Sequence, residues 1–257
     1  MRAISTFHQV TAFFLAAVAA VMLLSLPWWY LALLFLLYSA IVFSGVYFIR
    51  LNFFIRSRNH GSRNHKRVAI TFDDGPDSTL TAQLLAVLKE HQVPATFFVI
   101  GKNIAGKENL LREIAEQGHL VGNHSYDHGF WFSIASPEAI TEEIKKCNAA
   151  VAAVIGCEPQ FFRPPYGVTN PRVAEGIQMA AVTSIGWSLR SYDTMHQTPE
   201  ALLAAVKKKL KNGDVLLFHD TLEVTIAAMP EIIRYLRAQD VEVVSLDALL
   251  GQPAYRL

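Results

Sequence analysis

Acidic residues are missing from the first part of this 257-residue chain, whose first carboxylate is Asp73. No Asp, Glu, Lys or Arg occurs between Ala3 and Ile49, which argues against a soluble helix with a charged face in that region. Cysteine is scarce: Cys147 and Cys157 form no disulfide framework and lack metal-site spacing, so we interpret them as unpaired thiols. The formal net charge of +1 provides no basic field for nucleic acid.

An apolar stretch from Val10 to Ile49 is about twice as long as one membrane span, which needs about 20 residues. Pro27 divides this stretch, and aromatic residues that suit the headgroup region follow it. We therefore predict a transmembrane hairpin in residues 1–49, with spans at about 10–26 and 28–49 and a lipid bilayer as its partner. A cleaved signal peptide is disfavoured because the chain stays apolar far beyond the length of such a peptide.

Residues 50–67 have the opposite character, since they contain six cations and no acid. The cations are Arg50, Arg56, Arg58, Arg63, Lys66 and Arg67. We interpret this segment as a solvated basic linker that touches anionic lipid headgroups. Because positive charge marks cytoplasmic loops, the pattern places the domain that follows in the cytoplasm.

Strand-like and helix-like segments alternate from residue 68 to the end of the chain. Short β-branched or aromatic runs predict seven strands: Val68–Phe72, Ala95–Ile100, His119–Asn123, Phe161–Arg163, Ala181–Trp187, Val215–His219 and Val241–Val244. This alternation predicts an α/β fold with a parallel sheet, either doubly wound or closed as a (β/α) barrel. Seven strands favour a barrel that is incomplete, with its active site at the carboxyl ends of the strands.

Two adjacent carboxylates end the first predicted strand. Side chains of neighbouring residues diverge at a strand end, so Asp73 and Asp74 are expected to have different roles, one in metal binding and one in proton transfer. The alternative is an ordinary turn rich in Asp, Gly and Pro.

Two histidines, His124 and His128, follow the third predicted strand. Their spacing places both imidazoles on one face if the segment turns helically, and such a pair can bind one metal ion. With Asp74 they form a His₂-carboxylate set that leaves a coordination position for water, as a catalytic zinc site does. Iron and cobalt are alternative metals for this set.

Further polar residues follow the later strands. Arg163 is placed to pair with a carboxylate, and the prolines after it stiffen a loop whose backbone N–H near Tyr166 is an oxyanion-donor candidate. A rigid turn with a surface arginine is the alternative. His219 ends a buried strand and is a candidate general acid, while Asp193 is placed to orient it and to favour its protonated form.

Together these motifs resemble the polysaccharide deacetylase family, the NodB-type carbohydrate esterases that act on N-acetylated sugars. The resemblance covers roughly residues 66–250 and implies a deformed (β/α)7 barrel in residues 68–257. It also implies one divalent metal ion as cofactor, zinc in the first place, with cobalt, iron or nickel as alternatives. Its ligands are Asp74, His124 and His128 on this interpretation.

The resemblance implies catalytic roles for five residues. They are Asp73 as general base, Arg163 as its partner, the Tyr166 amide as oxyanion donor, His219 as general acid and Asp193 as the residue that tunes the acid. Leu217, Trp187 and Pro165 are expected to line the site where the acyl group binds.

One motif departs from the family pattern of two aspartates and a tryptophan. The chain has Arg190 in place of the first aspartate and Thr194 in place of the tryptophan. This substitution affects the wall of the substrate pocket. We interpret Arg190 as a contact to an anionic substrate group, or alternatively as a member of an ordinary ion pair.

The activity expected from the resemblance is metal-dependent N-deacetylation of peptidoglycan, a chitooligosaccharide or a related glycan. A deacetylase or deformylase of a lipid-linked amino sugar is the first alternative, and a catalytically silent sugar-binding membrane protein is the second. Anchored members of the family mostly face the cell exterior, which opposes the cytoplasmic location that the charge pattern predicts. Both sides of the membrane therefore remain open at this point.

Overall fold

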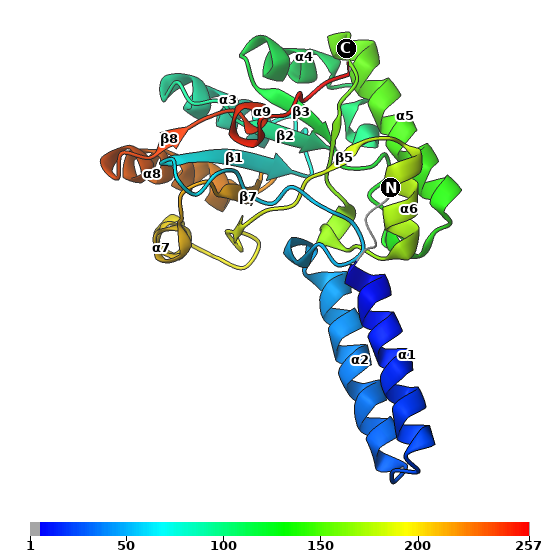
Figure 1. The fold of residues 1–257 in the computed structure, drawn as a ribbon. Coiled ribbons are helices and arrows are strands. Elements are labelled where there is room, and N and C mark those ends of the chain that lie inside the picture. The colour runs from blue at the N-terminus through cyan, green and yellow to red at the C-terminus, as the bar shows by residue number, and fades with distance from the viewer. Residues whose placement is uncertain (1–5, 257) are drawn as a thin grey trace.

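The computed structural model describes residues 6–256 and consists of a helical hairpin and an α/β domain (Figure 1). The hairpin projects away from the domain, and the described start of the chain lies close to the point where the hairpin joins it. The domain contains a sheet with helices packed around it.

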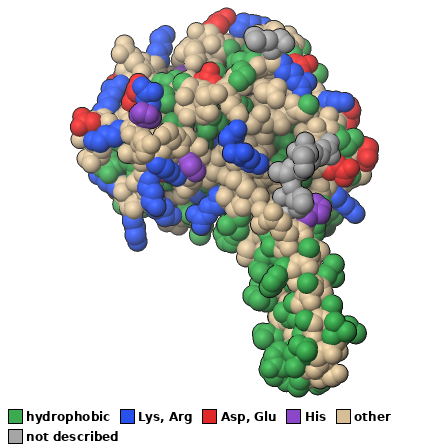
Figure 2. Space-filling model, viewed as in Figure 1, with side chains coloured by type: hydrophobic (Ala, Val, Ile, Leu, Met, Phe, Trp, Pro, Cys, Tyr) green, Lys and Arg blue, Asp and Glu red, His purple; other side chains and the backbone are tan. Residues whose placement is uncertain are grey.

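The hairpin is formed by α1 (Thr6–Leu23) and α2 (Trp29–Tyr47), which pack against each other. The Thr11 hydroxyl lies 3.0 Å from the Tyr38 hydroxyl, and the Phe14 ring stacks on the Tyr38 ring at 4.3 Å. Both helices are long and apolar enough to cross a membrane, with mean hydropathies of 1.7 and 2.0 and only 6% of each segment buried. Apolar side chains accordingly cover the surface of the hairpin (Figure 2).

The observed helices lie close to the two spans expected at about 10–26 and 28–49. α1 begins and ends earlier than expected, and the helices are separated by a turn that contains Pro27. Proline lacks the N–H that a continuing helix needs, so the break falls where the sequence predicts it.

The sheet of the domain has the strand order β5-β4-β3-β2-β1-β7-β6, and β8 pairs with the start of β1. The strands are β1 (Arg67–Asp73), β2 (Thr96–Val99), β3 (Leu120–Asn123), β4 (Phe161–Phe162), β5 (Thr183–Ser184), β6 (Leu189–Arg190), β7 (Val215–His219) and β8 (Glu242–Val243). All of these pairings are parallel. Within residues 6–256 the end strands β5 and β6 do not pair with each other, so the curled sheet is an incomplete barrel, as the sequence predicts.

Helices follow most of the strands, as expected for a parallel sheet. They are α3 (Leu80–Glu90), α4 (Glu108–Glu116), α5 (Pro137–Ile155), α6 (Pro171–Met179), α7 (Pro199–Lys209), α8 (Glu223–Ala238) and α9 (Leu246–Leu250). Three of them begin with a proline directly after a capping residue. The side chains of Ser136, Asn170 and Thr198 each accept a hydrogen bond from a backbone N–H in the first turn of α5, α6 and α7.

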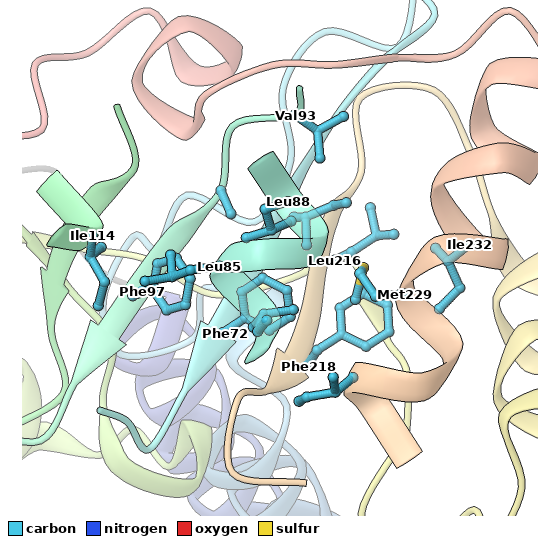
Figure 3. Close-up of a cluster of buried hydrophobic side chains, with 14 of the residues drawn as sticks. Phe72, Leu85, Leu88, Val93, Phe97, Ile114, Leu216, Phe218, Met229 and Ile232 are labelled. Atoms are coloured by element: carbon cyan, nitrogen blue, oxygen red, sulfur yellow. The ribbon is translucent and has the colours of Figure 1, made fainter. Parts of the chain in front are cut away.

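The main core lies between the central strands and the helices α3 and α8 (Figure 3). The Phe72 ring of β1 lies 5.3 Å from the Phe97 ring of β2 and 6.0 Å from the Phe218 ring of β7. Leu88 of α3 and Ile232 of α8 pack in the same cluster, and all five side chains are buried. Phe72 and Phe218 directly precede Asp73 and His219, so the core fixes the strand ends that carry polar residues.

Residues 50–67 differ from the solvated linker that their charge suggests. Ser57 is 3% exposed, and its hydroxyl lies 2.7 Å from the Ser184 hydroxyl. Arg58 bridges to Ile185, just beyond β5, and His60 bridges to Asp214, just before β7. The physical reason is that the gap between β5 and β6 leaves backbone groups without partners, and this segment provides them.

Within residues 6–256 the structure has one more strand than the seven that the sequence predicts. The expected strand Ala181–Trp187 is reduced to Thr183–Ser184, and a separate strand, Leu189–Arg190, follows it. Each of these two strands has only two residues, too few to produce a recognisable hydrophobic alternation.

Candidate active site

The ligand atoms of Asp74, His124 and His128 lie within 4.8 Å of one another beyond the carboxyl ends of β1 and β3. Asp74 Oδ1 is 3.6 Å from His124 Nε2 and 3.7 Å from His128 Nε2, which is too far for hydrogen bonds. Ligand atoms bound tetrahedrally at about 2.0–2.1 Å from zinc are about 3.3–3.4 Å apart. The three residues that the sequence singles out are therefore together, at separations that suit one small cation.

Backbone conformation brings these three side chains together in a way that their spacing does not predict. Residues 124–129 are not helical; instead Ser125 and His128 have left-handed φ values of 66° and 51°. The Ser125 N–H donates to Asn123 Oδ1, and the His128 N–H donates to Ser125 Oγ. Asp74 has a φ of 78°, which turns its carboxylate back toward His124, so the two aspartates do not diverge as expected.

The environment of His124 suits a metal ligand. Its Nδ1 lies 2.7 Å from the Arg163 carbonyl oxygen, to which it donates as N–H, and this leaves the Nε2 lone pair facing Asp74. Burial lowers the pKa of His124 to about 3, so the imidazole is neutral at physiological pH. A neutral imidazole with a fixed tautomer is the form that binds zinc.

Asp73 forms a buried pair with Arg163. Arg163 Nη1 donates to Asp73 Oδ1 at 2.6 Å and to Thr71 Oγ1 at 2.9 Å, while Nη2 donates to the Gly186 carbonyl at 3.1 Å. Burial raises the pKa of Asp73 above its usual range, and the charge and hydrogen bond of Arg163 oppose that shift. The second carboxylate oxygen lies 3.8 Å from His124 Nε2 and therefore borders the cluster of ligand atoms.

His219 and Asp193 form a second pair on the opposite side of Asp74. His219 Nδ1 lies 2.9 Å from Asp193 Oδ1, and His219 Nε2 lies 3.9 Å from Asp74 Oδ2. The other Asp193 oxygen accepts hydrogen bonds from the His219 N–H and from Thr225 Oγ1. Burial lowers the pKa of His219, but the hydrogen bond and charge of Asp193 outweigh it and raise that pKa to about 9. His219 is therefore protonated at neutral pH.

Comparison with known proteins agrees with this arrangement. A family model described as polysaccharide deacetylase matches residues 60–185. The peptidoglycan-N-acetylglucosamine deacetylase PgdA of Listeria monocytogenes is 35% identical over 191 residues, which are 74% of this chain and 40% of that protein. A chitooligosaccharide deacetylase of Rhizobium leguminosarum bv. trifolii is 36% identical over 156 residues, which are 60% of this chain and 72% of that protein. The chain belongs to the polysaccharide deacetylase family.

A solved structure supports the same conclusion for the fold. The Bc1960 peptidoglycan N-acetylglucosamine deacetylase matches with a TM-score of 0.74 at 29% identity, over 78% of this chain and 95% of that one. The resemblance drawn from the sequence motifs is thus confirmed, as is the deformed parallel barrel. The chain spans about two fifths of the length of the Listeria relative.

The loop after β4 borders the candidate metal ligands of this family member. Tyr166 has a left-handed φ of 59°, and its ring lies 4.7 Å from the His128 ring. Pro165 is buried at the start of the same loop. Gly167 has a φ of 67°, and a Cβ there would lie only 2.3 Å from the Trp187 ring, so Trp187 packs directly on this loop.

The remaining pocket candidates lie on β6 and β7. Leu217 is buried and shares a face of β7 with His219, since the two are two residues apart. Arg190 is paired in register with Leu217, and its guanidinium lies 5.9 Å from the Trp187 ring and 5.1 Å from the Tyr192 ring. Within residues 6–256 Arg190 forms no ion pair, so its interactions are with aromatic rings.

Several residues that hold the site in place were not found from the sequence. Thr225 of α8 binds Asp193, and Thr71 of β1 binds Arg163. Glu143 of α5 accepts hydrogen bonds from the N–H groups of Tyr126 and Asp127, between the two predicted ligands. These are ordinary polar residues within predicted strands and helices, and nothing in a single sequence separates them from surface positions.

Proposed function

We propose that this chain is a metal-dependent N-deacetylase that hydrolyses the acetamide of an N-acetylated amino sugar in a glycan. One observation carries the proposal: a carboxylate–arginine pair, a set of three metal-ligand candidates and a protonated histidine border one another. The separations are 3.8 Å from Asp73 to His124, 3.6 Å from Asp74 to His124 and 3.9 Å from Asp74 to His219. Relatives named as deacetylases of peptidoglycan N-acetylglucosamine and of chitooligosaccharide support this substrate class.

The donor set of Asp74, His124 and His128 fits one divalent ion, for which zinc is the first candidate. Such an ion would polarise the amide carbonyl and lower the pKa of water to about 7. The protein fixes the orientation of these ligands. The Arg163 carbonyl holds the His124 ring, and the left-handed backbone of Asp74 directs its carboxylate.

Asp73 is the general base in this proposal. Its carboxylate is held by Arg163 and borders the ligand set, so it is placed to accept a proton from the attacking water. The upward shift of its pKa by burial makes it a stronger base than an exposed aspartate. Arg163 remains fully buried and keeps the carboxylate in one orientation.

His219 is the general acid. An amine is a poor leaving group unless its nitrogen receives a proton as the bond to carbon breaks, and protonated His219 is placed to donate from Nε2. Asp193 holds the opposite nitrogen and favours the charged imidazole. The Tyr166 backbone N–H is proposed as the donor to the oxyanion, and Leu217, Trp187 and Pro165 as the wall around the acyl group.

The test is acetate release from an N-acetylchitooligosaccharide and from peptidoglycan. Activity should disappear after chelation and return when zinc or cobalt is added. Asp73→Asn and His219→Ala should each lower kcat by about 10²–10⁴-fold, the usual contribution of general acid–base catalysis. Asp127→Asn is a matched control, because Asp127 lies in the same loop as the two histidines and is exposed. Unchanged activity in Asp73→Asn would refute the assigned mechanism.

We also propose that α1 and α2 anchor the domain in a bilayer. Two adjacent apolar helices with only 6% of each segment buried would be unstable in water, because burial of apolar area is what stabilises such surfaces. A reporter fused to the C-terminus, read on both sides of the membrane, decides the location of the domain. A cytoplasmic signal would agree with the charge of residues 50–67, and an external signal with the family resemblance. Release of the full chain from membranes by alkaline carbonate would refute the anchor.

A further inference from the structure

A cavity of about 760 Å³ lies beside the end of α2, apart from the candidate active site. Three parts of the chain form its walls: residues 50–52 and 56–60 with Arg63, then Ser188, and residues 208–211 with Asp214. None of the proposed metal ligands or catalytic residues lines it. Its volume is within the range of about 300–1,000 Å³ that is typical of small-molecule sites.

The lining of this cavity is strongly basic. The cations are Arg50, Arg56, Arg58, Arg63, Lys208, Lys209 and Lys211, and the only carboxylate is Asp214. Asp214 is 2% exposed and is already bound by Arg63 at 2.5 Å, by the Ser188 hydroxyl and by the Lys211 N–H. The single acid of the cavity therefore neutralises Arg63 and leaves the other cations without a countercharge.

Six of these cations have no ionic partner in the part of the chain that the structure describes. No carboxylate lies within ion-pair distance of Arg50, Arg56, Arg58, Lys208, Lys209 or Lys211. Lysines at the end of α7 complement the helix dipole, and that explains Lys208 in isolation. It does not explain the arginines that a separate segment, residues 50–58, brings to the same cavity.

The cavity lies at the end of the domain from which the hairpin projects. Arg50 comes three residues after the last residue of α2, and α7 lies on the same lower side of the domain as the base of the hairpin (Figure 1). Lys and Arg side chains stand along that lower edge in Figure 2. If α2 spans a bilayer, residues directly after it are at the depth of the lipid headgroups.

We propose that this cavity binds the phosphate group of an anionic phospholipid from the membrane that the hairpin enters. The inference rests on the proposed anchor and is independent of the deacetylase chemistry. Arg56 and Arg58 present planar guanidinium groups that suit phosphate oxygens, and Lys208 and Lys211 add charge from another segment of the lining. Phosphate binding at this point would hold the domain against the membrane surface in one orientation.

The experiment uses the full chain in a neutral detergent and measures binding of short-chain phosphatidylglycerol and phosphatidylcholine by native mass spectrometry. Arg56→Gln, Lys208→Gln and Lys211→Gln are combined in one variant. Each cation near an anionic lipid surface contributes a factor of about five, so the triple variant should bind phosphatidylglycerol about 100-fold more weakly. Phosphatidylcholine should bind weakly to the wild type and to the triple variant alike.

A second triple variant, Lys89→Gln, Arg112→Gln and Lys145→Gln, removes the same charge from exposed positions outside the cavity. It should bind phosphatidylglycerol like the wild type. A third variant, Arg56→Lys, Lys208→Arg and Lys211→Arg, keeps the charge and should keep most of the binding, which separates loss of charge from loss of fold. Equal loss in the first two variants, or no loss in either, overturns the proposal.

Inorganic phosphate and pyrophosphate distinguish a lipid from a free anion. Phosphatidylglycerol that binds at least tenfold more tightly than either anion supports the lipid as ligand. If inorganic phosphate or pyrophosphate binds more tightly than phosphatidylglycerol, and this binding is lost in the first triple variant, the lipid assignment is overturned. Acetate release from a soluble substrate should be the same in the first triple variant and the wild type, so failure of the proposed deacetylase activity and failure of this proposal are distinct results.

Discussion

Replacing Asp193 by asparagine removes the charge that keeps His219 protonated and preserves nearly the same side-chain volume. Asp193 contacts His219 twice, through Nδ1 at 2.9 Å and through the backbone N–H at 2.7 Å. With this carboxylate the pKa of His219 is about 9; without it, burial should bring that pKa down toward the ordinary value of 6.5, although the charges of Asp73 and Asp74 still raise it.

The expected effect on rate follows from the fraction of His219 that is protonated. At pH 8 this fraction is about 90% for a pKa of 9 and about 3% for a pKa of 6.5, so a complete fall to 6.5 would lower kcat about 30-fold. At pH 6 the two fractions are nearly 100% and about 75%, so the same mechanism predicts a loss of less than twofold. Because a general acid acts only when protonated, activity falls as the pH rises through its pKa. The alkaline limb should therefore move from about pH 9 toward pH 6.5.

The assay is kcat for acetate release between about pH 5.5 and pH 9.5, at saturating divalent metal. Thr225→Val is the matched control, since it removes one hydrogen bond from the same carboxylate but leaves its charge. Its alkaline limb should stay within about half a pH unit of the wild type. An alkaline limb at the same pH in Asp193→Asn and the wild type would refute the assignment of His219 as an acid tuned by Asp193. A pH-independent loss would instead indicate a misplaced imidazole.

Three further predictions concern metal binding and stability. His128→Ala should weaken zinc binding more than 100-fold by calorimetry, because even loss of an outer hydrogen-bond partner costs about 10–100-fold; unchanged affinity would exclude the proposed ligand set. Burial raises the pKa of Asp220 to about 7, so the folded state favours its neutral form and loses stability as the pH rises from about 4 to 7. Asp220→Asn lacks that loss, so the unfolding temperature of the variant minus that of the wild type should increase from about pH 4 to pH 7 and stay constant above pH 7. A difference that does not change with pH would contradict the assigned cause. Leu84→Ala in the core should lower the free energy of unfolding in urea by about 2–5 kcal/mol without changing zinc affinity.

The positions of most site residues were predictable because parallel strands place their carboxyl ends on one rim. Asp73, Asn123 and His219 end β1, β3 and β7, and these strands were recognisable from their buried apolar residues. The ligand candidates follow two of those ends directly. The sequence therefore predicts the place of the candidate site through strand ends, which depend on the hydrophobic pattern and not on the loops.

The conformation of the loops was not predictable in the same way. Left-handed φ values at Asp74, Ser125 and His128 are uncommon for residues other than glycine, and the modest enrichment of Asp and His in this region is too weak to predict them. The surrounding contacts stabilise them, for example the hydrogen bond from Asn103 Nδ2 to the Asp74 carbonyl. Such contacts join residues that are distant in sequence, so one sequence without its fold does not reveal them.

The prediction of a solvated linker in residues 50–67 is wrong for a related reason. Charge indicates that side chains are solvated, but it says nothing about the backbone, and the backbone of this segment fills the gap in the sheet. The Arg58 N–H donates to the Ser184 carbonyl, and the Gly186 N–H donates to the Arg58 carbonyl. The arginine side chains still reach solvent or the basic cavity while the main chain is paired.

These contacts connect the hairpin to the candidate active site. The Gly186 carbonyl that accepts from Arg163 belongs to the residue that is paired with Arg58, and Arg163 in turn holds Asp73. On the other side of the site, the Thr169 N–H donates to the Val46 carbonyl in the last turn of α2. The chain just before the barrel thus braces both the arginine and the loop that carries the oxyanion-donor candidate. We therefore expect a domain that includes the end of α2 and residues 52–60 to hold this site more rigidly than one that begins at residue 68, where the sequence pattern places the start of the barrel.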